Sequence, residues 1–149
     1  MKGNARYLIL FSLLLITRIS FGQTSLETFI KDFDYEGRKE MKVSSEQLVT
    51  LLQEDKAVLV DIRFPEEQAA WQMDYAIKMP LPNLPARYDE LPKDKLIVTA
   101  CPHKDRAIIA MVYLKSKRYN VAYLKDGLLG LADYLRGDNA SDFIKNQKE

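Results

Sequence analysis

The feature that most constrains this chain is a pair of short, largely apolar runs at residues 57–60 and 96–100, each ending abruptly in polar residues. Such a run, bounded by polar or turn residues, is typical of a strand buried on both faces of a parallel sheet. The first run ends at Asp61 and the second at Cys101. Similar short runs at 76–79 and 121–124 alternate with helical patterns. This alternation predicts one α/β domain, with a mainly parallel central sheet flanked by helices on both faces.

Helix signals fill the segments between these runs. Ser44 and Gln47 have the spacing of a capping box, and the leucines that follow form a helical stripe. Pro65 is followed by two acidic residues, as in the first turn of a helix. Further helices are expected at 106–117 and at 128–135, the latter ending at Gly137. Because ligands of parallel sheets bind at the carboxyl ends of strands, Asp61 and Cys101 are expected on the functional edge.

The first 22 residues have the pattern of a secretory signal peptide. Lys2 and Arg6 precede an apolar stretch at 7–16, and Ser20 and Gly22 supply small residues for cleavage before Gln23. An uncleaved membrane anchor is the alternative, although the apolar stretch is short for a bilayer. We therefore divide the chain into a signal peptide (1–22), an N-terminal arm (23–40), a domain (41–137) and a polar C-terminal tail (138–149). The expected location is the periplasm or the exterior, with no membrane attachment after cleavage.

Charge and cysteine content narrow the possible functions. Cleavage would remove three basic residues and no acidic ones, which leaves 19 of the 22 basic residues against 21 acidic residues. This balance gives no electrostatic reason to expect nucleic-acid binding. The chain has one cysteine, so it cannot form an internal disulfide even in an oxidising compartment. A lone thiol in an exported protein is either buried and inert or retained for its reactivity.

The segment 101–106, called the cysteine loop below, predicts a nucleophile in an anion-binding site. It joins an expected strand to an expected helix, so backbone N–H groups and the helix N-terminus would surround the sulfur of Cys101. Lys104 and Arg106 add positive charge nearby. These features predict a lowered pKa for the Cys101 thiol. A small buried hydrophobic residue is the alternative interpretation of a cysteine at a strand end.

Three neighbouring polar residues have less specific interpretations. His103 is the only histidine, and with one cysteine in the chain a zinc site is not expected. We interpret it as a solvated residue that adds positive potential. Asp61 and Arg63 either brace the rim of the site or form an ordinary surface ion pair. No metal or other cofactor is expected.

Taken together, these residues resemble the rhodanese family of sulfurtransferases from about residue 58 to residue 131. The resemblance rests on four segments in the family's order: 61–70, 76–80, 101–106 and 119–127. It implies that Cys101 is catalytic, and that Pro102, His103, Lys104, Asp105 and Arg106 form the substrate-binding loop. The Cys101 thiolate would take the outer sulfur of thiosulfate or a persulfide, and the resulting persulfide would pass it to cyanide or a thiol. A binding or redox-sensing module without turnover, which recognises a partner protein, is the alternative.

The loop departs from related patterns in informative ways. Four residues separate Cys101 from Arg106, whereas cysteine-dependent phosphatases on a related fold have five, so the tighter loop suits sulfur better than phosphate. Lys104 stands where the rhodanese family usually has glycine, which predicts a backbone cost at this position. Pro102 lacks an N–H donor. Asp105 places a negative charge beside the site, and we expect it to act as a helix N-cap.

Overall fold

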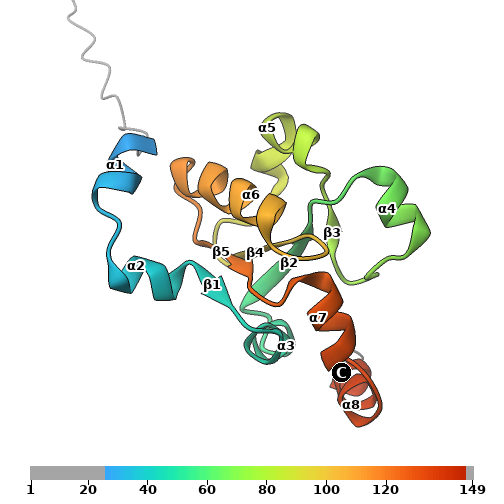
Figure 1. Cartoon of the computed structure of the whole chain (residues 1–149). Helices are drawn as coiled ribbons and strands as arrows, with labels where there is room; N and C mark the ends of the chain where they lie inside the picture. The colour runs from blue at the N-terminus through green and yellow to red at the C-terminus, as the bar shows by residue number, and fades with distance from the viewer. Residues whose placement is uncertain (1–25, 147–149) are drawn as a thin grey trace, which may run out of the picture.

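The fold is built on a single five-stranded sheet in which all strands are parallel (Figure 1). The computed structural model describes residues 26–146, so the predicted signal peptide and its cleavage point lie outside the described residues. The strands are β1 (Lys42–Val43), β2 (Ala57–Asp61), β3 (Ile77–Lys78), β4 (Leu96–Ala100) and β5 (Val121–Leu124). Their order across the sheet is β1-β5-β4-β2-β3. The predicted α/β fold with a parallel sheet is therefore confirmed.

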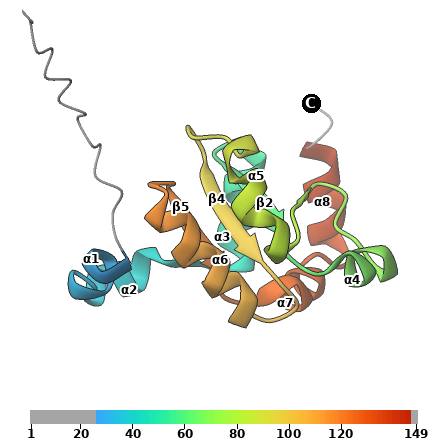
Figure 2. The same ribbon diagram turned by 90° about the horizontal axis from the view of Figure 1, so that it is seen from above.

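Helices cover both faces of this sheet. They are α1 (Leu26–Lys31), α2 (Tyr35–Glu40), α3 (Ser45–Gln53), α4 (Pro65–Ala70), α5 (Leu84–Arg87), α6 (Asp105–Ser116), α7 (Gly127–Tyr134) and α8 (Asp138–Asn146), with 3-10 turns η1 (Leu81–Asn83) and η2 (Tyr88–Glu90). Side chains of successive strand residues point to opposite faces. Val60 and Ile97 accordingly pack in one apolar cluster with α5 and α6, and Leu59 and Val98 in a second with α3, α7 and α8. Figure 2 shows α5 and α6 on the near face of the sheet and α3 on the far face.

Strand register brings the two predicted functional ends together. In the parallel pair β2 and β4, Asp61 lies opposite Ala100, the residue before Cys101. The Ile62 N–H donates to the Ala100 carbonyl at 3.0 Å and continues this pairing past the strand end. Asp61 and Cys101 thus lie side by side at the carboxyl ends of the neighbouring strands β2 and β4.

Two segments differ from expectation. The pattern does not predict β1, whose two residues pair only with β5 and are too short for a periodic signal. The first nine residues of the expected polar tail at 138–149 form α8, a helix that the sequence pattern does not indicate. Phe143 of α8 is buried and packs edge-on against Tyr75 with 5.0 Å between ring centroids. Phe143 thus packs α8 into the second apolar cluster.

The predicted N-terminal arm contains two short helices, α1 and α2. Asp34 ends the first part and caps α2 by accepting a hydrogen bond from the Gly37 N–H at 2.8 Å. Phe29 and Phe33 pack edge-on in this arm, whereas Tyr35 is largely exposed. Among the helices that the structure describes, none is long and apolar enough to cross a membrane.

Candidate active site

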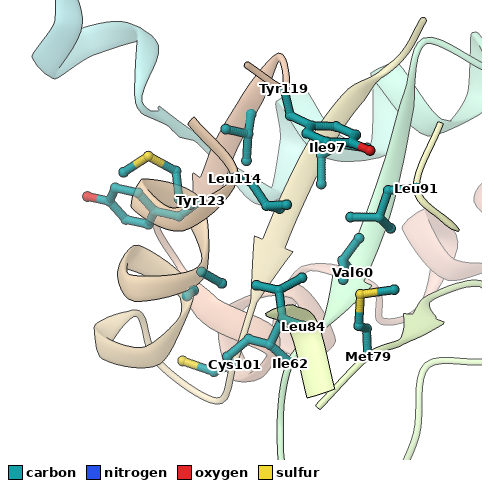
Figure 3. Close-up of a cluster of buried hydrophobic side chains, with 14 residues drawn as sticks. Val60, Ile62, Met79, Leu84, Leu91, Ile97, Cys101, Leu114, Tyr119 and Tyr123 are labelled. Atoms are coloured by element: carbon teal, nitrogen blue, oxygen red, sulfur yellow. The ribbon is translucent and has the colours of Figure 1, made fainter. Parts of the chain in front are cut away.

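Cys101 lies directly after β4, at the margin of one apolar cluster (Figure 3). Its exposed fraction is 0%. A reagent therefore reaches the sulfur only when surrounding groups move. Parallel sheets of this class bind their ligands at the carboxyl ends of the strands, and Cys101 lies at such an end.

The first turn of α7 holds the cysteine loop in place. The Leu128 N–H donates to the Cys101 carbonyl at 2.8 Å, and the Leu129 N–H to the Pro102 carbonyl at 3.3 Å. Gly127 has φ +67, and a Cβ there would lie 2.3 Å from the carbonyl oxygens of both Pro102 and His103. Only glycine fits this backbone angle and this approach. Gly127 is therefore required for the shape of the loop.

The environment of the sulfur contains both stabilising and destabilising groups for a thiolate. Burial raises the pKa of the Cys101 thiol, and the backbone N–H groups of Ala107, His103 and Arg106 lower it only in part. Among side-chain charges, that of Asp105 has the largest effect, and it raises the pKa further. The Cys101 thiol donates a hydrogen bond to Oδ1 of Asp105 across 3.5 Å. The backbone N–H groups act in the predicted direction, but the predicted lowering of the Cys101 pKa is wrong.

Arg106 forms an ion pair with Glu67, a residue that the sequence pattern does not assign to the site. Nη1 and Nη2 of Arg106 donate to the two carboxylate oxygens of Glu67 at 2.6 and 2.9 Å. This pairing lowers the pKa of Glu67 to about 2 and raises that of Arg106 above its ordinary value. The guanidinium thus joins α6 to α4 rather than lying free for an anion. In the sequence, Glu67 is recognisable only as an acid in a first helical turn, and its partner is 39 residues away.

Asp61 and Arg63 form a buried ion pair, so the surface-pair interpretation is wrong. Their exposed fractions are 1% and 0%. Arg63 Nη2 donates to Oδ2 of Asp61 at 2.6 Å and to the Trp71 carbonyl at 2.9 Å, and its guanidinium stacks 3.8 Å from the Trp71 ring centroid. The pair ties the end of β2 to the end of α4. It thereby positions Glu67, and through Glu67 the first turn of α6.

The remaining residues of the cysteine loop are accessible. His103 and Lys104 are exposed, and Pro102 is half-buried. Lys104 has φ −151 and is itself the N-cap of α6. The expected glycine-like backbone cost at Lys104 is therefore wrong, and so is the N-cap role of Asp105, which is the first helical residue. Between residues 26 and 146, no group of three His, Cys, Asp or Glu side chains is arranged to hold a metal ion.

Comparison with known proteins decides the family. The family model described as "Rhodanese-like domain" matches residues 44–133, more than half of the chain. The chain belongs to the rhodanese-like family. A curated relative, a sulfurtransferase from Allochromatium vinosum, is 34% identical over 93 residues, which cover 61% of this chain and 87% of that protein.

Solved structures share the rhodanese-like fold. A rhodanese-related protein from Thermoplasma volcanium aligns with a TM-score of 0.57 at 20% identity, over 62% of this chain and 90% of that chain. A rhodanese-like domain protein from Staphylococcus aureus aligns with a TM-score of 0.56 at 21% identity, over 60% and 89% of the two chains. At these identities the likeness concerns the fold alone. It agrees with the central parallel sheet and its flanking helices.

Proposed function

We propose that this rhodanese-like protein is a sulfurtransferase that carries sulfane sulfur on Cys101. The observation that carries the proposal is the place of Cys101, directly after β4 and separated by four residues from Arg106 in the first turn of α6. Backbone N–H groups of Ala107, His103 and Arg106 favour a negative sulfur at this place. The Allochromatium vinosum relative, described as a sulfurtransferase, supports the same reaction class.

The reaction has two half-reactions. Once the groups that cover the sulfur move, the Cys101 thiol loses its proton to solvent, and the thiolate attacks the outer sulfur of the donor. The donor S–S bond breaks, and its electron pair leaves with sulfite or with a thiolate. A thiophilic acceptor, such as cyanide or a thiol, then takes the outer sulfur and restores the Cys101 thiolate.

Thiocyanate release tests this proposal. The full chain is supplied with thiosulfate or with the persulfide of 2-mercaptoethanol, and cyanide is the acceptor. The proposal predicts thiocyanate production above the uncatalysed rate with at least one donor, and its loss in Cys101→Ser. No production with either donor would overturn the proposal.

A binding or redox-sensing module is the second candidate. The specific observation in its favour is that Cys101 is fully buried and donates its thiol hydrogen to Asp105. A protonated, covered thiol reacts slowly with sulfane donors. A module of this kind would produce no thiocyanate in the assay. Its function would instead be detected as oxidation of Cys101 or as binding of a partner protein.

We further propose that the protein is exported. Support comes from the basic, apolar and small-residue pattern in residues 1–22. N-terminal sequencing of the protein recovered from its native host tests this. The proposal predicts a chain beginning at Gln23, and a retained residue 1 would contradict cleavage.

A further inference from the structure

We propose that Asp105 makes this site selective for organic persulfides over thiosulfate. The proposal rests on the proposed function, because it concerns which donor loads Cys101. It assigns Asp105 as a specificity-determining residue through its contact with the reacting sulfur.

The carboxylate of Asp105 lies next to the atom that reacts. Its Oδ1 is 3.5 Å from the Cys101 sulfur. The Arg106 backbone N–H and the Cys101 thiol hold the pKa of Asp105 below its ordinary value, so the group is ionised at neutral pH. Any negative charge that develops on the sulfur or on the donor is therefore formed beside a fixed negative charge.

The cations near the loop leave no excess positive charge to attract an anionic donor. Arg106, which the family resemblance places in the substrate-binding loop, already has both of its terminal nitrogens on Glu67. The cysteine loop together with Glu67 carries two cations and two carboxylates, so these four side chains have no net charge. An incoming anion must compete with Glu67 for Arg106.

The two donor classes differ sharply in charge. Attack of the Cys101 thiolate on thiosulfate brings three negative charges together, and it yields a charged persulfide and the sulfite dianion. Attack on the terminal sulfur of a neutral persulfide, RSSH, involves one negative charge, which leaves on the thiolate RS⁻ as the S–S bond breaks. Because like charges a few ångströms apart repel strongly away from bulk water, Asp105 penalises the first reaction more than the second.

The rim of the site offers apolar surface for an organic donor. Phe64 is 45% exposed, and its ring centroid lies 5.2 Å from the Arg106 guanidinium carbon. Leu129 is 49% exposed on the first turn of α7, where its N–H holds the Pro102 carbonyl. Apolar side chains on both flanks of the loop can pack against the R group of a persulfide. Thiosulfate has no such group.

The test measures kcat/KM for thiosulfate and for the persulfide of 2-mercaptoethanol, whose organic part is uncharged. The variants are Asp105→Asn and Asp105→Ser, two neutral residues that are both tolerated at helix starts. Glu54→Gln removes one negative charge at the opposite edge of the sheet and is the matched control. The ratio of the two values cancels any change in the nucleophilicity of Cys101.

The proposal predicts that the wild-type ratio favours the persulfide. Each Asp105 variant is expected to raise the ratio of thiosulfate to persulfide at least about tenfold, and Glu54→Gln less than about twofold. An unchanged ratio in both Asp105 variants, or an equal gain with both donors, would overturn the specificity role while leaving the sulfurtransferase standing. Absence of sulfur transfer from either donor in every variant would overturn both proposals.

Discussion

Glu67 holds the guanidinium of Arg106 with both carboxylate oxygens, and this contact joins the first turn of α4 to the first turn of α6. Glu67 also accepts a hydrogen bond from the Phe64 N–H at 3.0 Å, which caps its own helix. One carboxylate therefore links α4 to α6, the helix that begins within the cysteine loop. Arg63 stabilises the same turn of α4, because its Nη1 donates a hydrogen bond to the Glu67 carbonyl.

Glu67→Gln should lower stability because it removes the charge from this bidentate contact. The side chain of Glu67 is 33% exposed, so solvent screening limits the expected loss to about 1 kcal/mol. Urea unfolding of the full chain measures it. Glu66→Gln, in the same helical turn, is the control and should change stability by less than about 0.5 kcal/mol. Equal losses in the two variants would show that the Arg106 contact contributes nothing specific.

The same pair predicts a dependence of stability on acid. The pKa of Glu67 is about 2, below its ordinary value, so the folded state favours the charged carboxylate. Its contribution is present above the unfolded pKa and disappears as pH falls toward 2. The difference in unfolding free energy between wild type and Glu67→Gln should therefore shrink between about pH 5 and pH 2. A difference that stays constant across this range would contradict the assignment.

Gly127→Ala should be strongly destabilising because its Cβ would meet the backbone of the cysteine loop. Carbonyl oxygens of Pro102 and His103 lie 2.3 Å from that position, and φ is +67. The expected loss is about 3 kcal/mol or more. Gly137→Ala is a matched control, because Gly137 also has positive φ but no atom within 4 Å, so only the backbone cost of about 1 kcal/mol applies. Equal losses would mean that the close approach to the loop is unimportant.

The raised pKa of Cys101 predicts slow alkylation at neutral pH. The rate of reaction with iodoacetamide should rise with pH to a midpoint above the value of about 8.5 for a free thiol. Asp105→Asn should lower that midpoint, since it removes a negative charge beside the sulfur. A wild-type midpoint below that of a free thiol would mean that burial and Asp105 do not dominate the pKa of Cys101.

Much of the fold could be predicted because the central strands are continuous apolar runs. A strand buried on both faces leaves this pattern regardless of its neighbours, as β2 and β4 do. β1 left no pattern because two residues are too few for a period. The docking of α8 depends largely on Phe143, whose burial requires Tyr75 and the neighbouring elements to be in place.

The position of the cysteine loop could be predicted, but its electrostatics could not. The loop follows from an apolar strand that ends at the cysteine, and the segment 119–127, which contains Gly127, is part of the family resemblance. The direction of the Cys101 pKa depends on how burial compares with three backbone N–H groups and one carboxylate. That balance depends on where these groups lie in the folded chain. A count of nearby cations in the sequence therefore predicts the wrong direction for the pKa of Cys101. The partner of Arg106 likewise lies on another helix.

The proposed function requires that Cys101 accept sulfane sulfur, and the intact mass of the protein reports this step without any coupled reaction. The full chain is incubated with the persulfide of 2-mercaptoethanol, freed of excess donor and weighed by mass spectrometry, with Cys101→Ser treated in parallel. We expect a gain of one sulfur atom that cyanide removes and that is absent in Cys101→Ser. No gain in the wild type, or the same gain in Cys101→Ser, would contradict sulfur transfer through Cys101.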